Sequence, residues 1–129
     1  GEWRARVTPV LQSLATRPAE EVVSQHLSAV GTRDPVAMTS DYALDAVLVR
    51  PDAQFTGWSE IADYFETVPV RLKDREVVFG ELEASDYHVA GVTWEITDAE
   101  GRVASGRDEF VVTEGRITHQ RTSLDSDDF

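Results

Sequence analysis

Cysteine is absent from this chain of 129 residues. Its absence excludes disulfides, thiolate nucleophiles and zinc sites built on thiolates. Basic residues are scarce as well, because 12 Lys and Arg stand against 24 Asp and Glu, and the formal net charge is −12. Phosphate backbones and anionic membrane surfaces are bound through basic side chains. We therefore expect neither a nucleic-acid partner nor a membrane partner.

Long apolar runs are also missing. No stretch reaches the roughly 20 apolar residues that span a bilayer, and no basic segment followed by an apolar one opens the sequence. We expect a cytoplasmic protein. Hydrophobic residues make up 41% and charged residues 28% of the chain, which is typical of a globular domain. We predict one domain over residues 1–129, with residues 1–17 as an N-terminal helical arm and residues 125–129 as a frayed acidic tail.

Helical signals dominate the first third of the sequence. Part of residues 3–15 has helical spacing, and a better amphipathic pattern begins at Pro18 and ends at Gly31. Asp34 and Pro35 predict a cap and a first-turn proline for a short helix. The apolar stripe of the second helix consists of Ala19, Val22, Val23, His26, Leu27 and Val30.

A hairpin that feeds a helix is the most informative pattern in the chain. Residues 46–49 form a β-branched apolar run, residues 51–52 are a turn signal, and residues 54–56 return as a second strand. Gly57 follows, and we predict a helix that is capped by Ser59 and stopped by Pro69. Turn signals then separate four predicted antiparallel strands, at residues 77–83, 87–97, 102–113 and 116–124. Helices followed by such a meander predict an α+β fold.

Residues 18–124 resemble the NTF2-like superfamily and, within it, the SnoaL-like and DUF4440-like small proteins. The resemblance implies a cystatin-like or NTF2-like α+β roll, in which N-terminal helices pack on a strongly curved antiparallel sheet and enclose a conical pocket. Glycines inside the predicted strands suit such curvature, since glycine often marks a bend or bulge. Those glycines are Gly80, Gly91 and Gly106. The fold carries many functions, so the resemblance implies a pocket and not a reaction.

Three residues stand out against the ketosteroid isomerase branch of this family. His26 corresponds to its oxyanion-stabilising tyrosine, Arg50 to its proton-shuttling aspartate, and Asp108 to its protonated aspartate. Because position 50 lacks the carboxylate, the steroid isomerase reaction is not carried over. Relatives include epoxide hydrolases, dehydratases and polyketide cyclases that use neither metal nor organic cofactor, and we expect no cofactor here.

The same three residues have suitable chemistry. Imidazole titrates near neutrality, a desolvated carboxyl can act as an acid, and a guanidinium can stabilise an oxyanion or clamp a carboxylate. Structural alternatives remain for each residue: His26 as a core histidine, Arg50 in an ion pair with Asp52 or Asp108, and Asp108 in a solvated charge cluster. Alternation places Asp108 on an apolar strand face, which favours function.

Aromatic and polar side chains complete the predicted pocket. The expected ligand-binding residues are Tyr42, Trp58, Phe65, Trp94, Phe110, Gln120 and Thr122. The three histidines lack metal-ligand spacing, so we expect no metal site. The resemblance implies that Gln120 and Thr122 face the cavity, and it predicts a homodimer through an outer sheet face around Val111, Ile117 and His119.

These observations favour a protein that binds a small, apolar organic molecule. The preferred function is cofactor-independent acid-base chemistry of the isomerase, dehydratase, cyclase or epoxide hydrolase type. The alternative is a module that binds a ligand or a protein without catalysis.

Overall fold

A computed structural model describes residues 15–125 and 129. The helices are α2 (Ala19–Thr32), α3 (Pro35–Thr39) and α4 (Trp58–Leu72). The strands are β1 (Tyr42–Arg50), β2 (Ala53–Thr56), β3 (Glu76–Phe79), β4 (Glu83–Ala84), β5 (Val89–Asp98), β6 (Gly101–Thr113) and β7 (Arg116–Leu124). The predicted helix within residues 3–15 lies outside the described residues, apart from its last position.

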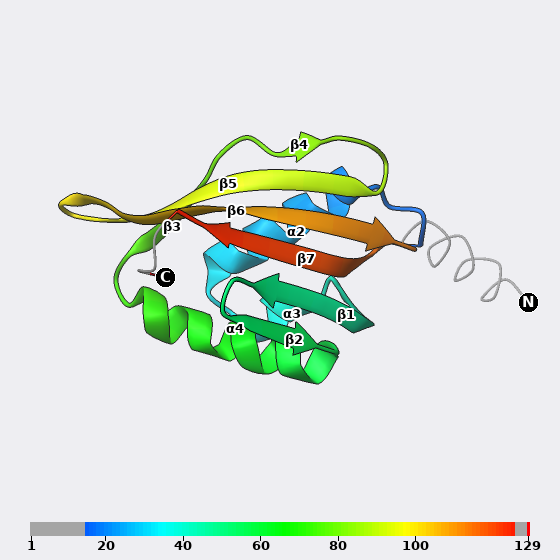
Figure 1. Cartoon of the computed structure of the whole chain (residues 1–129), viewed down its shortest axis with the longest axis horizontal. Helices are drawn as coiled ribbons and strands as arrows, with labels where there is room; N and C mark the ends of the chain where they lie inside the picture. Colours follow the sequence, from blue (N-terminus) through cyan, green and yellow to red (C-terminus); the bar gives the residue numbers. More distant parts are fainter. Residues whose placement is uncertain (1–14, 126–128) are drawn as a thin grey trace, which may run out of the picture.

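One curved sheet organises the molecule. Its strand order is β2-β1-β7-β6-β5-β3, with β4 paired to β5. Figure 1 shows α2 crossing one face of this sheet and α4 running beside the β1–β2 end. The predicted α+β class is therefore confirmed. The strands from β3 to β7 pair antiparallel as expected, but β1 pairs with β7 in parallel, so the sheet is mixed.

The C-terminal end of helix α2 differs from the prediction. Helix α2 continues past Gly31 to Thr32, and Arg33 takes the left-handed conformation at φ 61° that the glycine was expected to supply. The Arg33 guanidinium donates to the main-chain oxygens of Lys73 and Arg75, which anchors this side chain. Such contacts offset the cost of a non-glycine residue at positive φ.

Helix α4 differs at both of its ends. Its N-cap is Gly57, at φ 87°, in place of Ser59, and Pro69 lies inside the helix instead of stopping it. Proline lacks the N–H that would continue the hydrogen-bond ladder. The helix nevertheless extends to Leu72, because Val68 and Leu72 are both buried in the core.

The core lies between the helices and the concave face of the sheet. The predicted stripe of α2 places Val22, Val23 and His26 in it. Strand residues alternate as predicted, with Phe110 and Val112 of β6 buried on the face shared with Asp108. The two-residue periodicity of the strand therefore directs the Asp108 side chain toward the core.

A β-bulge overturns one prediction for β7. Opposite β6, Val111 pairs with His119 and Val112 pairs with Ile117, so Thr118 is the extra residue. The extra residue moves Ile117 to the inner face, where it is fully buried. Ile117 consequently does not belong to the outer face with His119, whereas Gln120 and Thr122 do face inward as predicted.

The tail at residues 125–129 also differs from the expected fraying at its two described residues. Asp125 donates its main-chain N–H to Ser105, and its carboxylate accepts a hydrogen bond of 2.6 Å from the Ser105 hydroxyl. Phe129 packs at the pocket described below. In the described ranges, no helix is long and apolar enough to cross a membrane.

Gly106 allows a close approach that shapes the pocket wall. A Cβ at this position would lie closer than 3.0 Å to the Trp94 ring and to the main-chain oxygen of Ser123. We expect Gly106→Ala to destabilise the protein by about 1–3 kcal/mol through overpacking. Chemical denaturation measures this loss.

Gly31→Ala is the matched control, because a Cβ there meets nothing within 4 Å. A helical alanine should stabilise by roughly 0.5–1 kcal/mol. Equal effects of the two substitutions would contradict the role assigned to Gly106.

Candidate functional site

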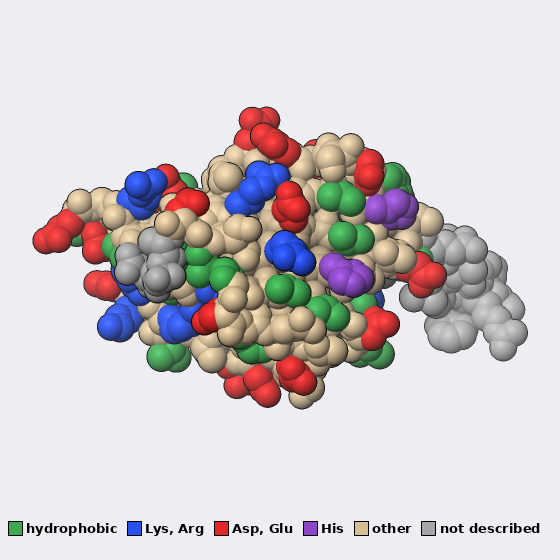
Figure 2. Space-filling model, in the orientation of Figure 1, with side chains coloured by type: hydrophobic (Ala, Val, Ile, Leu, Met, Phe, Trp, Pro, Cys, Tyr) green, Lys and Arg blue, Asp and Glu red, His purple; other side chains and the backbone are tan. Residues whose placement is uncertain are grey.

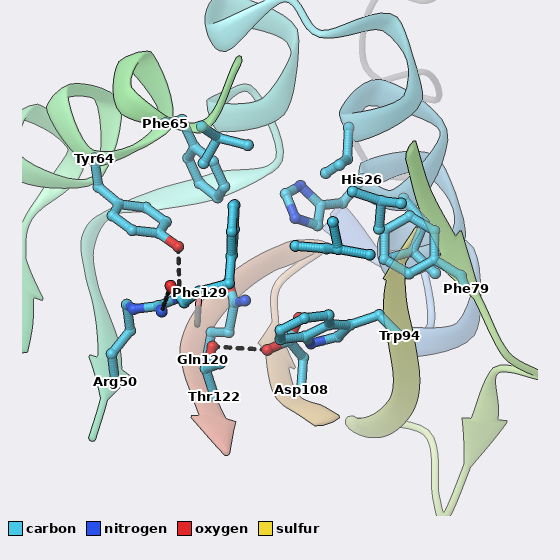
Figure 3. Close-up of a pocket in the computed structure, with 15 residues that line it drawn as sticks. His26, Arg50, Tyr64, Phe65, Phe79, Trp94, Asp108, Gln120, Thr122 and Phe129 are labelled. Carbon is cyan, nitrogen blue, oxygen red and sulfur yellow. Dashed lines mark hydrogen bonds between the residues drawn. The ribbon is translucent and has the colours of Figure 1, made fainter. Parts of the chain in front are cut away.

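A pocket opens between α2, α4 and the concave face of the sheet (Figure 3). Its free volume is about 70 Å³. Every strand from β1 to β7 except β2 and β4 contributes to its wall. The lining residues are His26, Leu27, Val30, Arg50, Tyr64, Phe65, Val68, Val77, Phe79, Trp94, Ile96, Asp108, Gln120, Thr122 and Phe129.

His26, Arg50 and Asp108 all line this one pocket. Of the residues expected to bind ligand, four line it as well: Phe65, Trp94, Gln120 and Thr122. The other three do not. Tyr42 and Phe110 lie behind the His26 ring, at ring-centroid distances of 5.2 and 5.7 Å, and Trp58 packs at the start of α4.

His26 is held in one orientation deep in the protein. Its Nδ1 lies 2.9 Å from the main-chain oxygen of Met38, an acceptor, so Nδ1 carries the hydrogen of the neutral ring. Its Nε2 therefore bears the lone pair and lies 3.4 Å from the Tyr42 hydroxyl. Burial lowers the pKa of His26 to about 4, although the Met38 carbonyl acts in the opposite direction.

A polar chain leads from His26 toward Asp108. The Tyr42 hydroxyl donates to Gln120 Oε1. Burial raises the pKa of Tyr42 well above its usual value, so this phenol stays protonated. With its oxygen occupied, Gln120 turns its amide nitrogen to Asp108 as a donor.

Asp108 is an acid inside an apolar pocket. Its carboxylate accepts a hydrogen bond of 2.7 Å from the Thr122 hydroxyl. Burial raises the pKa of Asp108, while hydrogen bonds from Thr122, Gln120 and Trp94 and the charge of Arg50 oppose the rise. Burial dominates, so protonation is easier than for an exposed aspartate.

Arg50 stands at the opposite wall of the pocket (Figure 3). It donates to the Tyr64 hydroxyl over 2.7 Å and to the main-chain oxygen of Phe129 over 2.6 Å. The expected pairing with Asp52 exists, at 3.9 Å from Arg50 Nε, but the Asp52 side chain is 82% exposed. Such a pair contributes little, so the guanidinium serves mainly the pocket.

The sequence interpretation missed Phe129 and the cationic side of α4. Arg71 Nη1 also donates to the Phe129 main-chain oxygen, over 2.9 Å, and the Arg71 guanidinium lies 4.4 Å from the Phe129 ring. The sequence offered two signals: Phe129 follows an acidic segment, and Arg71 and Arg75 lie near the end of a predicted helix. Neither signal shows that the C-terminal segment contacts α4. Within residues 15–125 and 129, no group of three His, Asp or Glu side chains is arranged for a metal.

The arrangement of these elements defines a class of protein, the NTF2-like α+β cone. A family model of the SnoaL-like domain matches residues 23–120. The chain therefore belongs to the SnoaL-like family of the NTF2-like superfamily. A comparison of the chain with curated proteins found no match.

Solved structures share this fold at low sequence identity. A candidate isomerase of the SnoaL-like family from Agrobacterium tumefaciens has a TM-score of 0.69 and 23% identity, over 82% of this chain and 96% of the other. A candidate ketosteroid isomerase from Kribbella flavida has a TM-score of 0.71 and 18% identity, over 87% of this chain and 78% of the other. A candidate polyketide cyclase from Sinorhizobium meliloti has a TM-score of 0.64 and 20% identity, over 80% of this chain and 94% of the other.

The lowered pKa of His26 predicts a dependence of stability on pH. Between pH 6.5 and about 4, the unfolded chain binds a proton that the native imidazole does not accept, so stability falls as pH drops through this window. Urea unfolding at pH 7 and 4.5 should show that the wild type loses roughly 2–3 kcal/mol more than His26→Gln does. Identical losses in the two proteins would mean that the imidazole is not held neutral.

Proposed function

We propose that the protein binds a small, mainly apolar organic molecule in this pocket and transfers protons on it without a cofactor. The observation that carries this proposal is the opposite effect of burial on two facing groups. Burial keeps His26 unprotonated and favours the protonated form of Asp108. An unprotonated imidazole and a carboxyl group with a raised pKa thus line one apolar pocket, and perturbed groups in a cavity favour an active site.

His26 would act as the base through Nε2. With a pKa of about 4, its basicity equals that of an ordinary aspartate, and it is almost entirely free of its proton at neutral pH. The hydrogen bond from Nδ1 to Met38 fixes the ring, which supports a positioned base.

Asp108 and Arg50 would handle the other changes in charge. The proton taken by His26 leaves an electron pair that moves to a substrate oxygen, and Arg50 would stabilise this oxygen. Asp108 would supply a proton at a second position, which completes an isomerisation, a dehydration or a ring opening. The raised pKa of Asp108 supports its role as the donor.

A panel of cyclic ketones, hydroxyketones and small epoxides tests this proposal. Thermal shift identifies bound compounds, and NMR in deuterated water follows proton exchange and turnover. We expect His26→Gln and Asp108→Asn to keep binding and to lose about 100-fold or more in rate. Asp108→Asn should also be more stable than the wild type at pH 7, with an advantage that shrinks as the pH falls toward 3.8.

His88→Gln and Glu109→Gln are the matched controls, because both side chains are exposed. Neither should change rate or binding. Turnover that survives in both pocket variants would refute the assigned roles, and bound compounds without exchange in any protein would leave a binding module.

The non-catalytic alternative has one observation in its favour. His26 is only 2% exposed, and its Nδ1 already donates to the main-chain oxygen of Met38. A histidine buried and hydrogen-bonded in this way can serve the core alone. The experiment above separates the two functions.

We also propose that the outer sheet face forms a homodimer. Val89, Val111, His119 and Val47 lie side by side across four neighbouring strands. Each is at least partly exposed, and Figure 2 shows hydrophobic and histidine side chains gathered on this face. An apolar row on a sheet face away from the helices suits a self-complementary contact.

Val111→Glu should therefore convert a dimer into a monomer, because it would place two like charges in the shared interface. Sedimentation equilibrium measures the mass. Val70→Glu is the control, since Val70 is 74% exposed on α4, away from this face. A wild type that is monomeric, or a Val111→Glu protein that remains dimeric, would refute the interface.

A further inference from the structure

Phe129 occupies the mouth of the pocket as an aromatic ligand would (Figure 3). Its ring lies 6.4 Å from the Trp94 ring in an edge arrangement, and the Arg71 guanidinium stands 4.4 Å from its centroid. Arg75 approaches the same ring at 5.9 Å. Aromatic edges and guanidinium planes are favourable partners for any aromatic ring.

The main-chain oxygen of Phe129 lies between two guanidinium groups. Arg50 Nη2 donates to it over 2.6 Å and Arg71 Nη1 over 2.9 Å. Charged donors bind an oxyanion strongly, and arginine matches the two oxygens of a carboxylate. Two guanidinium groups that converge on one oxygen therefore form a position suited to an anionic oxygen.

Arg71 has one donor to spare. Its Nη2 is buried and has no hydrogen-bond partner among the described residues. In this same set, no Asp or Glu carboxylate lies within ion-pair distance of Arg71. A buried donor without a partner is costly, and the second oxygen of a carboxylate would satisfy it.

The free volume shows that Phe129 must move for a ring to enter. The pocket holds about 70 Å³, whereas a cavity that binds benzene has about 150 Å³. Phe129, Arg50 and Tyr64 separate this pocket from an outer groove of about 560 Å³ that they also line. Displacement of Phe129 would join the two spaces.

We propose that the pocket selects aromatic compounds bearing a carboxylate, which displace Phe129 and place their carboxylate between Arg50 and Arg71. This inference rests on the proposed binding of an organic molecule and specifies its chemical class. The acidic surface of the chain makes the pair of arginines a local exception to a net charge of −12. Asp52, Glu60 and Asp63 line the outer groove, so the preferred place for an anion is the inner end.

Binding of 2-naphthoate and of neutral 2-naphthamide, measured by calorimetry, tests this proposal. Phe129→Ala should bind naphthoate about tenfold or more tightly than the wild type, because the internal competitor is gone, and Arg71→Met should bind it about tenfold or more weakly. The amide should bind more weakly than the acid in Phe129→Ala. Its affinity should be the same in the wild type and Arg71→Met.

Arg102→Gln is the matched control, since this side chain is 63% exposed and forms an ion pair with Glu95. It should bind naphthoate as the wild type does. Equal binding of acid and amide, or an unchanged affinity in Phe129→Ala, would overturn the proposal. Should Arg71→Met fail to fold, the comparison of acid with amide in Phe129→Ala decides alone.

The Trp94 indole resonance in NMR locates the ligand, because Trp94 contacts Phe129. Naphthoate binding that leaves this resonance unmoved would also overturn the proposal. The readout is affinity and not turnover, so this inference can fail while acid-base catalysis stands, and the reverse also holds.

Discussion

The register of β7 between β6 and β1 is the constraint on which the whole pocket depends. Thr122 lies opposite Asp108 on one side, and Gln120 lies opposite Leu48 on the other, two residues from Arg50. A slip by one residue would turn every one of these side chains to the other face. The bulge at Thr118 brings Ile117 and Gln120 to the same face despite their odd spacing, which places an apolar anchor beneath the polar chain.

Burial then gives the polar groups their properties. The same low-polarity surroundings lower the pKa of His26 and raise the pKa of Asp108. Both shifts cost stability at some pH, and a chain under selection for stability alone would place apolar residues at these positions. Arg50 donates to Tyr64 and to the main-chain oxygen of Phe129 at the pocket mouth. The proposed proton transfer uses the groups deep in the pocket, and the proposed carboxylate site lies at its mouth.

Much of the fold could be predicted because it follows from local rules. The spacing of apolar residues in α2, the cap at Asp34 and the alternation of β6 correctly indicated helix, helix and strand. Helix ends were less predictable, since contacts distant in sequence outweighed local preference. Helix α2 is capped by Arg33 and does not end at the predicted Gly31, and Pro69 lies within α4. His26, Arg50 and Asp108 were placed on one pocket by resemblance to a family, and local pattern alone could not have grouped them.

The sequence by itself determined the period of each element, the acidic surface and the inward direction of Asp108, because these depend on neighbours along the chain. Only the tertiary structure decided that Tyr42 and Phe110 stand behind His26, that Ile117 is in the core, and that Phe129 meets Arg50 and Arg71. Each of these facts depends on a bulge or on a contact between distant segments. Such contacts are set by how the sheet curves and how the remaining space is filled, and neither has a signature in local spacing.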